Sequence, residues 1–192
     1  MSQAEIGTVG QMGAAGLRKR LRAARLYVVS DDQTPLNGLP QLLAAALEGG
    51  ADVVQLRRKR EEPDELLSVA RELAALCHRM GALFVVDDHL ELAMQAGADG
   101  VHLGQEDTPP EQARARLGPA ALIGLSTHTA AQADAARALP VDYISAGPVY
   151  ATPTKAGRPA VGLEYVTAAA TRARVPLVAI GGLESGTEAV RA

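Results

Sequence analysis

Three polar side chains alternate along a short stretch of the chain, at Gln55, Arg57 and Lys59. Alternate residues of an extended chain point the same way, so the amide and the two cations should face one spot, with Arg58 on the other side. A converging guanidinium and ammonium can hold a diphosphate through charge-assisted hydrogen bonds. The spacing therefore predicts a diphosphate site, although a charged loop that faces solvent uses the same residue types.

Two aspartates, Asp88 and Asp107, follow the next two apolar runs of the chain. If those runs are adjacent strands, the two carboxylates lie side by side, and paired hard oxygen ligands suit Mg²⁺. Capping of the helices that follow is the alternative explanation for either aspartate alone. The histidines His89, His102 and His128 have a dispersed spacing that matches no zinc pattern, so we assign them no metal.

A third group of residues is rich in hydroxyls and glycine. Thr152, Thr154 and Lys155 share one loop, and Gly181-Gly182 follows a later apolar run. Hydroxyls, backbone N–H groups and a lysine together can bind a second, smaller phosphate. Ser126 has no base pattern near it in the sequence, so we interpret it as a hydrogen-bond donor to an anion.

The elements that must position these groups alternate regularly. Short apolar runs bounded by Gly, Pro or Asp predict seven buried strands, at 26–29, 53–56, 83–86, 100–103, 121–124, 143–146 and 177–180. Alanine-rich amphipathic stretches between them predict helices at 40–48, 63–80, 91–96, 110–118, 129–139 and 163–172. Strand and helix in alternation predict an α/β fold with a parallel sheet, and the side chains above fall at the carboxyl ends of its strands.

This order predicts a (βα)8 TIM barrel, truncated after the seventh βα unit, with its chemistry at the carboxyl ends of the strands. We expect residues 1–20 to form a flexible N-terminal extension and residues 21–192 to form the barrel domain. Asp52, Asp99 and Asp142 each come just before a strand, where an acidic residue should stabilise the opposite face of the barrel.

The composition of the chain limits the kinds of molecule that it is expected to bind. The net charge of -3 argues against a chain that coats nucleic acid or a membrane and favours small phosphorylated molecules. The one cysteine, Cys77, lies in an apolar run and should be a buried inert thiol, which fits the reducing cytoplasm. No apolar stretch reaches the length of a membrane span, and no signal peptide is apparent. The sequence leaves open whether the chain forms a homo-oligomer.

Five motifs in order resemble the thiamine phosphate synthase family. They are Q-x-R-x-K from Gln55, H-x-G-Q-E-D from His102, G-x-S-x-H-T from Gly124, G-P-x-Y-x-T-x-T-K from Gly147, and A-I-G-G from Ala179. The resemblance runs from about Leu26 to Ala192. It implies a barrel enzyme, a transferase that joins 4-amino-2-methyl-5-pyrimidinylmethyl diphosphate to 4-methyl-5-(2-phosphoethyl)thiazole, or its carboxylated form, with Mg²⁺ as cofactor. The products are thiamine phosphate and pyrophosphate.

The resemblance also implies roles for the matching residues. The pyrimidine diphosphate would be bound by Gln55, Arg57, Lys59, Asp87, Ser126 and Lys155, and the thiazole phosphate by Thr152, Thr154 and Gly182. Mg²⁺ would be held by Asp88 and Asp107. Asp87 departs from the family, which usually has Asn there. A thiazole tautomerase of the same superfamily and an inactive truncated barrel that only binds a partner remain the alternatives; Lys59 and Asp107 favour the synthase.

Overall fold

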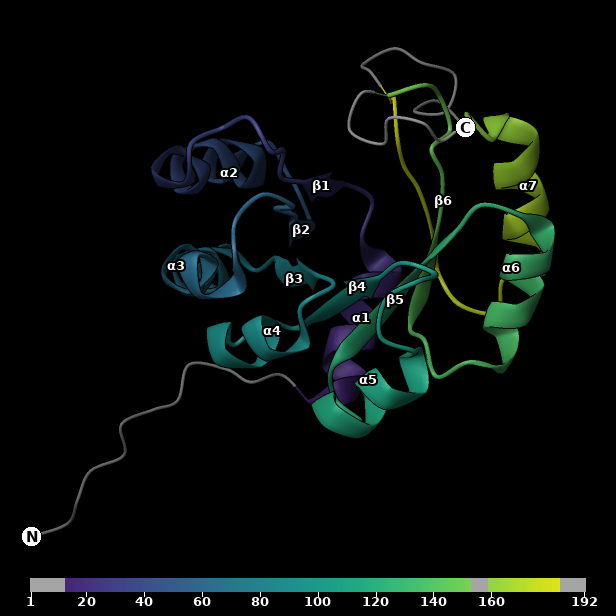
Figure 1. Ribbon diagram of the computed structural model, residues 1–192, viewed down its shortest axis with the longest axis horizontal. Coiled ribbons are helices and arrows are strands. Elements are labelled where there is room, and N and C mark those ends of the chain that lie inside the picture. Colours follow the sequence, from purple (N-terminus) through teal and green to yellow (C-terminus); the bar gives the residue numbers. More distant parts are fainter. Residues whose placement is uncertain (1–12, 153–158, 184–192) are drawn as a thin grey trace, which may run out of the picture.

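Seven parallel strands form one curved sheet in the computed structural model, which describes residues 13–152 and 159–183. The strand order follows the chain, from β1 to β7, and each strand is hydrogen-bonded to the next. Helices lie around the outside of the strands in a nearly closed α/β TIM-like barrel (Figure 1). The prediction of a parallel sheet built from seven βα units is therefore confirmed.

The boundaries agree closely with the sequence pattern. The strands are β1 (Tyr27–Val29), β2 (Val53–Leu56), β3 (Leu83–Asp87), β4 (Gly100–Leu103), β5 (Leu122–Thr127), β6 (Tyr143–Ala146) and β7 (Leu177–Ala179). The α-helices are α1 (Ala14–Ala23), α2 (Leu39–Glu48), α3 (Pro63–Met80), α4 (Leu90–Ala96), α5 (Pro110–Leu117), α6 (Ala130–Ala135) and α7 (Gly162–Arg172). Short 3₁₀ turns, η1 (Leu36–Gly38) and η2 (Ala136–Ala138), precede α2 and follow α6. None of the helices in the described part of the chain is long and apolar enough to cross a membrane.

Helix α3 shows how local signals set these boundaries. Pro63 occupies its first turn, and the side chains of Glu62 and Glu65 form a reciprocal capping box with backbone N–H groups. The helix ends at Gly81, whose φ of 78° is left-handed and favours glycine. Its apolar face, which includes Cys77, packs against the sheet. Burial raises the pKa of that thiol to about 12, as expected for an inert cysteine.

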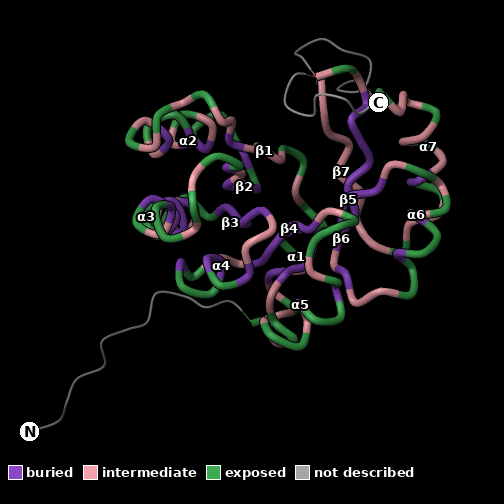
Figure 2. The backbone as a smooth tube through the Cα atoms, viewed as in Figure 1, coloured by how far each residue is buried: buried purple, intermediate pink, exposed green. Residues whose placement is uncertain are grey.

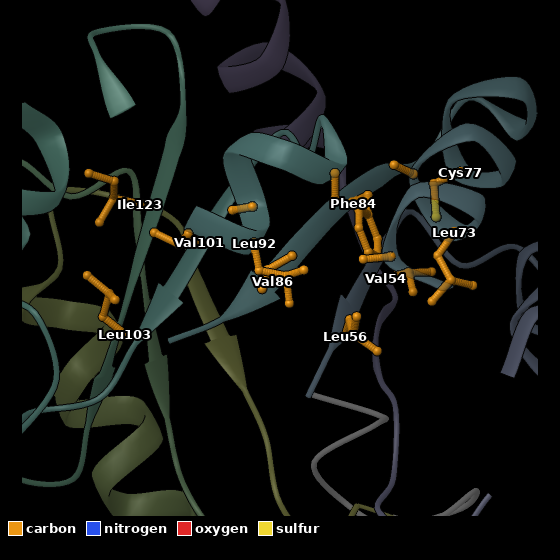
Figure 3. Close-up of a cluster of buried hydrophobic side chains, with 14 of the residues drawn as sticks. Val54, Leu56, Leu73, Cys77, Phe84, Val86, Leu92, Val101, Leu103 and Ile123 are labelled. Carbon is orange, nitrogen blue, oxygen red and sulfur yellow. The ribbon is translucent and has the colours of Figure 1, made fainter. Parts of the chain in front are cut away.

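Two apolar layers make up the core. Side chains that point outward from the strands pack under the helices, as Figure 3 shows for Val54 and Phe84 against Leu73 of α3. Side chains that point inward fill the barrel at the N-terminal ends of the strands, among them Leu83 and Tyr143. Figure 2 shows that β2 to β6 are buried while the helices expose their outer sides.

Helix α1 takes up the last part of the range 1–20, over which we expected a flexible extension. Helix α1 begins at Ala14, and both Leu17 and Leu21 are buried against Val53, Leu83 and other residues of the inner layer. The helix lies across the N-terminal ends of the strands, behind β4 and β5 in Figure 1. The burial of these two leucines in the barrel explains why residues 14–23 form a helix, which the many basic residues of this segment did not suggest. Residues 1–12 lie outside the described part.

The carboxylates of Asp52, Asp99 and Asp142 each connect the starts of two neighbouring strands, at the face of the barrel where we expected them to stabilise the fold. Each accepts a hydrogen bond from a backbone N–H at the start of the preceding odd-numbered strand. The bonds are Leu26 N–H to Asp52 (3.0 Å), Phe84 N–H to Asp99 (2.8 Å) and Ile123 N–H to Asp142 (2.9 Å). These bonds satisfy donors that the parallel ladder leaves unpaired at its N-terminal end, so this face of the barrel is stabilised by its own polar residues.

Candidate active site

A cavity of about 480 Å³ opens at the carboxyl ends of the strands. This volume suits a small organic ligand, and TIM barrels place their active sites at this face. The loops and strand ends of all seven units contribute to it. It is lined by Val29, Ser30, Asp31, Gln55, Arg57, Lys59, Asp87, Asp88, His102, Gly104, Asp107, Ser126, His128, Ser145, Pro148, Thr152, Ile180, Gly181 and Gly182.

The strands deliver polar side chains here because their inward positions change from apolar to polar along each strand. In β2, Val53 lies in the apolar layer and Gln55 in the cavity; in β3, Leu83 gives way to Asp87. Inward side chains recur every second residue, so the two sets belong to one face of the sheet. The barrel interior is therefore apolar at the N-terminal ends of the strands and polar at their carboxyl ends, where the cavity lies.

The predicted cationic group is assembled as its spacing indicated. Asp87 lies at its centre: one carboxylate oxygen accepts a hydrogen bond from the Gln55 amide (3.0 Å), and the other lies 3.1 Å from Lys59 Nζ and 3.6 Å from Arg57 Nε. Burial raises the pKa of Asp87, against the effect of the two cations. The carboxylate of Asp87, a position where the family usually has Asn, therefore links Gln55, Arg57 and Lys59 into one cluster.

Arg58 points away from this cluster, as the alternation predicted. Its guanidinium is buried and forms an ion pair with Glu61, and it donates to the carbonyls of Asp31 (2.8 Å) and Thr34 (2.7 Å). These bonds fasten the loop after β1 to the loop after β2. Of the adjacent arginines, Arg57 faces the cavity and Arg58 has a structural role.

The loop after β1 contributes residues that the sequence reading missed. Ser30 Oγ accepts from the N–H of Arg57 (2.9 Å), and Asp32 accepts from Arg57 Nη1 (3.3 Å) and from the N–H of Lys59 (3.0 Å). Asp32 thus holds both cationic residues in place. The signal was present in the sequence, because Ser30-Asp31-Asp32 follows the first apolar run as the other polar groups follow theirs.

Asp88 and Asp107 lie together, as predicted from adjacent strands. A side-chain hydrogen bond joins the two carboxyl groups, and Lys59 Nζ contacts Asp88. Burial and the nearby charge of Asp87 raise the pKa of Asp88 to about 6, whereas the hydrogen bonds that Asp107 accepts from Asp88 and from the N–H of Gly104 lower its pKa despite partial burial. Two neighbouring carboxylates provide the oxygen donors that a hard divalent cation prefers.

Neither aspartate caps the helix that follows it. The N-caps of α4 and α5 are His89 and Pro109, and neither helix has a side-chain cap. Asp88 has a φ of 60°, a left-handed conformation that costs free energy for a residue with a Cβ, and its N–H bonds to the carbonyl of His102 (2.9 Å). Such strain is typical of functional residues, which weighs against the capping alternative. The described residues hold no cluster of three or more candidate metal ligands, so the metal hypothesis rests on this pair.

Some of the residues that we predicted to bind a second phosphate lie on the opposite side of the cavity. Thr152, Gly181 and Gly182 line it. Gly182 has a φ of 68°, and a Cβ there would lie 2.8 Å from the carbonyl oxygen of Tyr150, so only glycine fits. Thr154 and Lys155 lie outside the described residues.

Two further polar residues on the cavity floor were not assigned to the site from the sequence. His102 of β4 and Ser145 of β6 are buried, line the cavity and lie within hydrogen-bond distance of each other (3.3 Å). The ring of His102 also bonds to Ser126 Oγ (3.0 Å). Their inward positions on strands whose carboxyl ends carry the site were the signal, because His102 shares the face of Gly100 and Ser145 that of Tyr143.

A barrel of parallel strands with a polar, cation-lined cavity at its C-terminal face defines a class of α/β enzyme folds that bind phosphorylated ligands. Comparison with known proteins specifies the family. The family model described as "Thiamine monophosphate synthase" matches residues 26–190. This chain belongs to that family.

Individual relatives agree. The thiamine-phosphate synthase of Gloeobacter violaceus is 50% identical over 175 residues, which cover 91% of this chain and 50% of that protein. The thiamine-phosphate synthase of Thermobifida fusca is 47% identical, covering 87% of this chain and 78% of its own length. The chain spans about half the length of several curated relatives it matches. A solved structure of thiamine phosphate pyrophosphorylase from Pyrococcus furiosus superposes with a TM-score of 0.74 at 34% identity, covering 88% of this chain and 78% of that one.

Proposed function

We propose that this chain catalyses thiamine phosphate formation from an aminopyrimidinylmethyl diphosphate and a thiazole phosphate, in its plain or carboxylated form. The observation that carries the proposal is one cavity in which Arg57 and Lys59 converge beside the joined carboxyl groups of Asp88 and Asp107. Cations and a paired-carboxylate metal site together suit a diphosphate leaving group. The names of the relatives support the same reaction.

The reaction breaks the bond between the pyrimidine methylene carbon and the diphosphate oxygen, and it forms a bond from that carbon to the thiazole nitrogen. The electron pair of the broken bond leaves with pyrophosphate. Negative charge therefore accumulates on the departing diphosphate, and Arg57 and Lys59 are placed to stabilise it. Their carboxylate partners Asp32 and Asp87 fix both cations before the substrate arrives, which lowers the cost of reorganisation.

Mg²⁺ would be held by Asp88 and Asp107, and when bound it would supply positive charge to the diphosphate oxygens. The donor set fits, because two carboxylates leave most positions to phosphate oxygens and water. The raised pKa of Asp88 means that protons compete with the cation for this pair at a pH of about 6 and below, so Mg²⁺ binding should weaken there. With Mg²⁺ in place, Lys59, which contacts Asp88, would turn toward the diphosphate.

Gln55 and Ser126 are the neutral polar groups of the pyrimidine side of the cavity. The Gln55 amide donates to Asp87, which leaves its carbonyl oxygen to accept from an exocyclic amino group of the pyrimidine.

The thiazole phosphate would be bound at the opposite side by Thr152 and the backbone of Gly182, with Thr154 and Lys155 on the loop that follows Thr152. We also propose a cytoplasmic location, because a reducing compartment suits a protein whose single cysteine, Cys77, is a free thiol.

A direct assay tests the reaction. Purified protein supplied with both substrates and Mg²⁺ should form thiamine phosphate, measured as fluorescent thiochrome after oxidation. Asp107→Asn should remove the Mg²⁺ dependence together with nearly all of the activity. Glu106→Gln, which removes a neighbouring exposed carboxylate that does not line the cavity, is the matched control and should keep activity within about twofold. Folded wild-type protein that forms no product would refute the proposal, and isomerisation of the thiazole substrate alone would instead indicate the tautomerase.

A further inference from the structure

A line of hydrogen bonds crosses the inside of the barrel from its N-terminal end to the cavity. The phenol oxygens of Tyr27 and Tyr143 lie 2.8 Å apart, and the Tyr143 oxygen lies 3.1 Å from His102 Nδ1. On the other side of the ring, His102 Nε2 lies 3.0 Å from Ser126 Oγ. The line therefore joins a residue of β1 to a serine of β5 that lines the cavity, through side chains of β6 and β4.

Gly124 is the residue that makes room for this contact. It lies on β5 between Tyr143 and His102, and a Cβ there would overlap the Tyr143 ring and lie 2.5 Å from His102 Nδ1. Its backbone does not need glycine's freedom, because its φ is not positive. The absence of a side chain at this position therefore serves the meeting of the phenol and the imidazole.

The directions of these bonds follow from counting donors. Each phenol has one hydrogen to donate, and burial raises the pKa of both, so both stay protonated. Among the described residues, the phenol of Tyr27 has that of Tyr143 as its hydrogen-bond partner. If Tyr27 donates to Tyr143, then Tyr143 donates to His102 Nδ1, and every hydrogen has an acceptor. The opposite direction leaves the Tyr27 hydrogen without an acceptor among residues 13–152 and 159–183.

An acceptor at Nδ1 makes the neutral imidazole a donor at Nε2. Nε2 lies 3.0 Å from Ser126 Oγ and 3.3 Å from Ser145 Oγ, so its hydrogen has the shorter contact with Ser126, and Ser145 Oγ donates to Ser126 Oγ at 3.5 Å. With its lone pairs engaged by these donors, Ser126 is left to donate its own hydrogen, and it lines the cavity into which the hydrogen would point.

We propose that His102 is a positioning residue, held as its Nε2–H tautomer by the Tyr27–Tyr143 pair, which orients the hydroxyl of Ser126 to donate to the diphosphate. This inference rests on the proposed function, because the diphosphate is the ligand that it assigns to Ser126. The opposite tautomer would take up the Ser126 hydrogen and present only an oxygen lone pair to an anion.

The tautomer can be measured without any substrate. In protein labelled with ¹⁵N-histidine, two-bond proton–nitrogen correlations report which ring nitrogen carries the proton, and His102→Gln identifies the signals of His102 among the four histidines. The expected result is a single Nε2–H tautomer. Tyr143→Phe, which removes only the phenol oxygen, should produce a mixture of tautomers, and Tyr27→Phe should do so to a smaller extent. A pure Nδ1–H tautomer in the wild type would overturn the proposal.

Binding of inorganic pyrophosphate in the presence of Mg²⁺, measured by calorimetry, tests the effect on Ser126. Ser126→Ala and Tyr143→Phe should each weaken binding by about tenfold, as expected for one hydrogen bond to a charged group. The double variant should bind no more weakly than Ser126→Ala, because the phenol acts through the serine. Tyr165→Phe is the control, since its phenol bonds to Thr127 outside this line and its loss should change binding by less than twofold.

The two failures are distinguishable. Additive effects in the double variant, or a Tyr143→Phe protein that is folded and binds pyrophosphate like the wild type, would overturn the positioning role while leaving the proposed function intact. A wild-type protein that binds no pyrophosphate would overturn the proposed function, and with it the ligand assigned to Ser126.

Discussion

The guanidinium of Arg18 on helix α1 lies 2.6 Å from the carboxylate of Asp142, measured from Nε to Oδ1, although 124 residues separate them. The second oxygen of the same carboxylate lies 2.6 Å from Arg114 Nη2 and accepts the N–H of Ile123. One buried side chain therefore joins α1, α5 and the starts of β5 and β6 at the N-terminal face of the barrel.

Replacement of Asp142 tests this junction. Asp142→Asn should lower the free energy of unfolding by about 2 kcal/mol, because two guanidinium groups lose the charge that compensates their partial burial. The measurement is urea denaturation followed by circular dichroism. Asp134→Asn removes an exposed carboxylate 3.4 Å from Arg172, and this control should change stability by less than about 0.5 kcal/mol. Equal effects of the two substitutions would contradict the assignment.

Helix α1 should contribute to stability through its two leucines. Leu21 is 4% exposed, and Leu21→Ala should cost about 2 to 4 kcal/mol through lost burial and the cavity left behind. Leu42→Ala makes the same chemical change in α2 at a side chain that is 46% exposed, and it should cost less than about 1 kcal/mol. If both variants unfold at the same urea concentration, α1 is not part of the cooperative core.

A glycine in the barrel should be intolerant of even one methyl group. Gly124→Ala places a Cβ against Tyr143 and His102, and we expect a loss of about 1 to 3 kcal/mol in unfolding free energy from overpacking. Gly13→Ala is the matched control, because nothing lies within 4 Å of the added atom. A neutral Gly124→Ala would mean that the tyrosine and histidine can separate without cost.

The contact between His78 and Asp99 predicts a pH dependence. The hydrogen bond from His78 Nε2 to Asp99 (3.1 Å) raises the pKa of His78 above its ordinary value of 6.5, against the effect of burial. A raised folded-state pKa gives stability that is fully present below the unfolded pKa and is lost as the pH rises through the folded pKa. His78→Gln should therefore destabilise the protein more at a pH of about 5.5 than at about 9, by less than about 1 kcal/mol since the pair is partly exposed. A difference that grows toward high pH would contradict this.

Periodicity predicted the strands and most helices well because local signals and burial agree there. Helix α3, for example, has a proline at its start, a glycine at its end and an apolar face between them. Helix α1 has no proline in its first turn and no glycine at its end, its apolar face is short, and its basic residues suggested a solvated tail. Its order depends on Leu17 and Leu21 meeting the barrel interior, which is tertiary information.

The site shows the same division. Arg57, Lys59, Asp88 and Asp107 could be grouped from the sequence because each follows a strand, and parallel strands bring such ends together. Gln55 joined them because it alternates with Arg57 and Lys59. His102 and Ser145 lie inside strands that resemble ordinary apolar runs, with no neighbouring motif of alternating polar residues. Alternation along the strands could have indicated the direction in which they point, but the space left at Gly124 for the contact between Tyr143 and His102 is tertiary information.

The carboxylates of Asp52, Asp99 and Asp142 all act at the face of the barrel away from the cavity. Their bonds link β1 with β2, β3 with β4, and β5 with β6, so the chain is organised in double βα modules. Since each module is fastened at its base, the loops at the other end can change in length and residue type without loosening the scaffold. This division makes the fold a good starting point for exchanging whole substrate-binding loops between relatives.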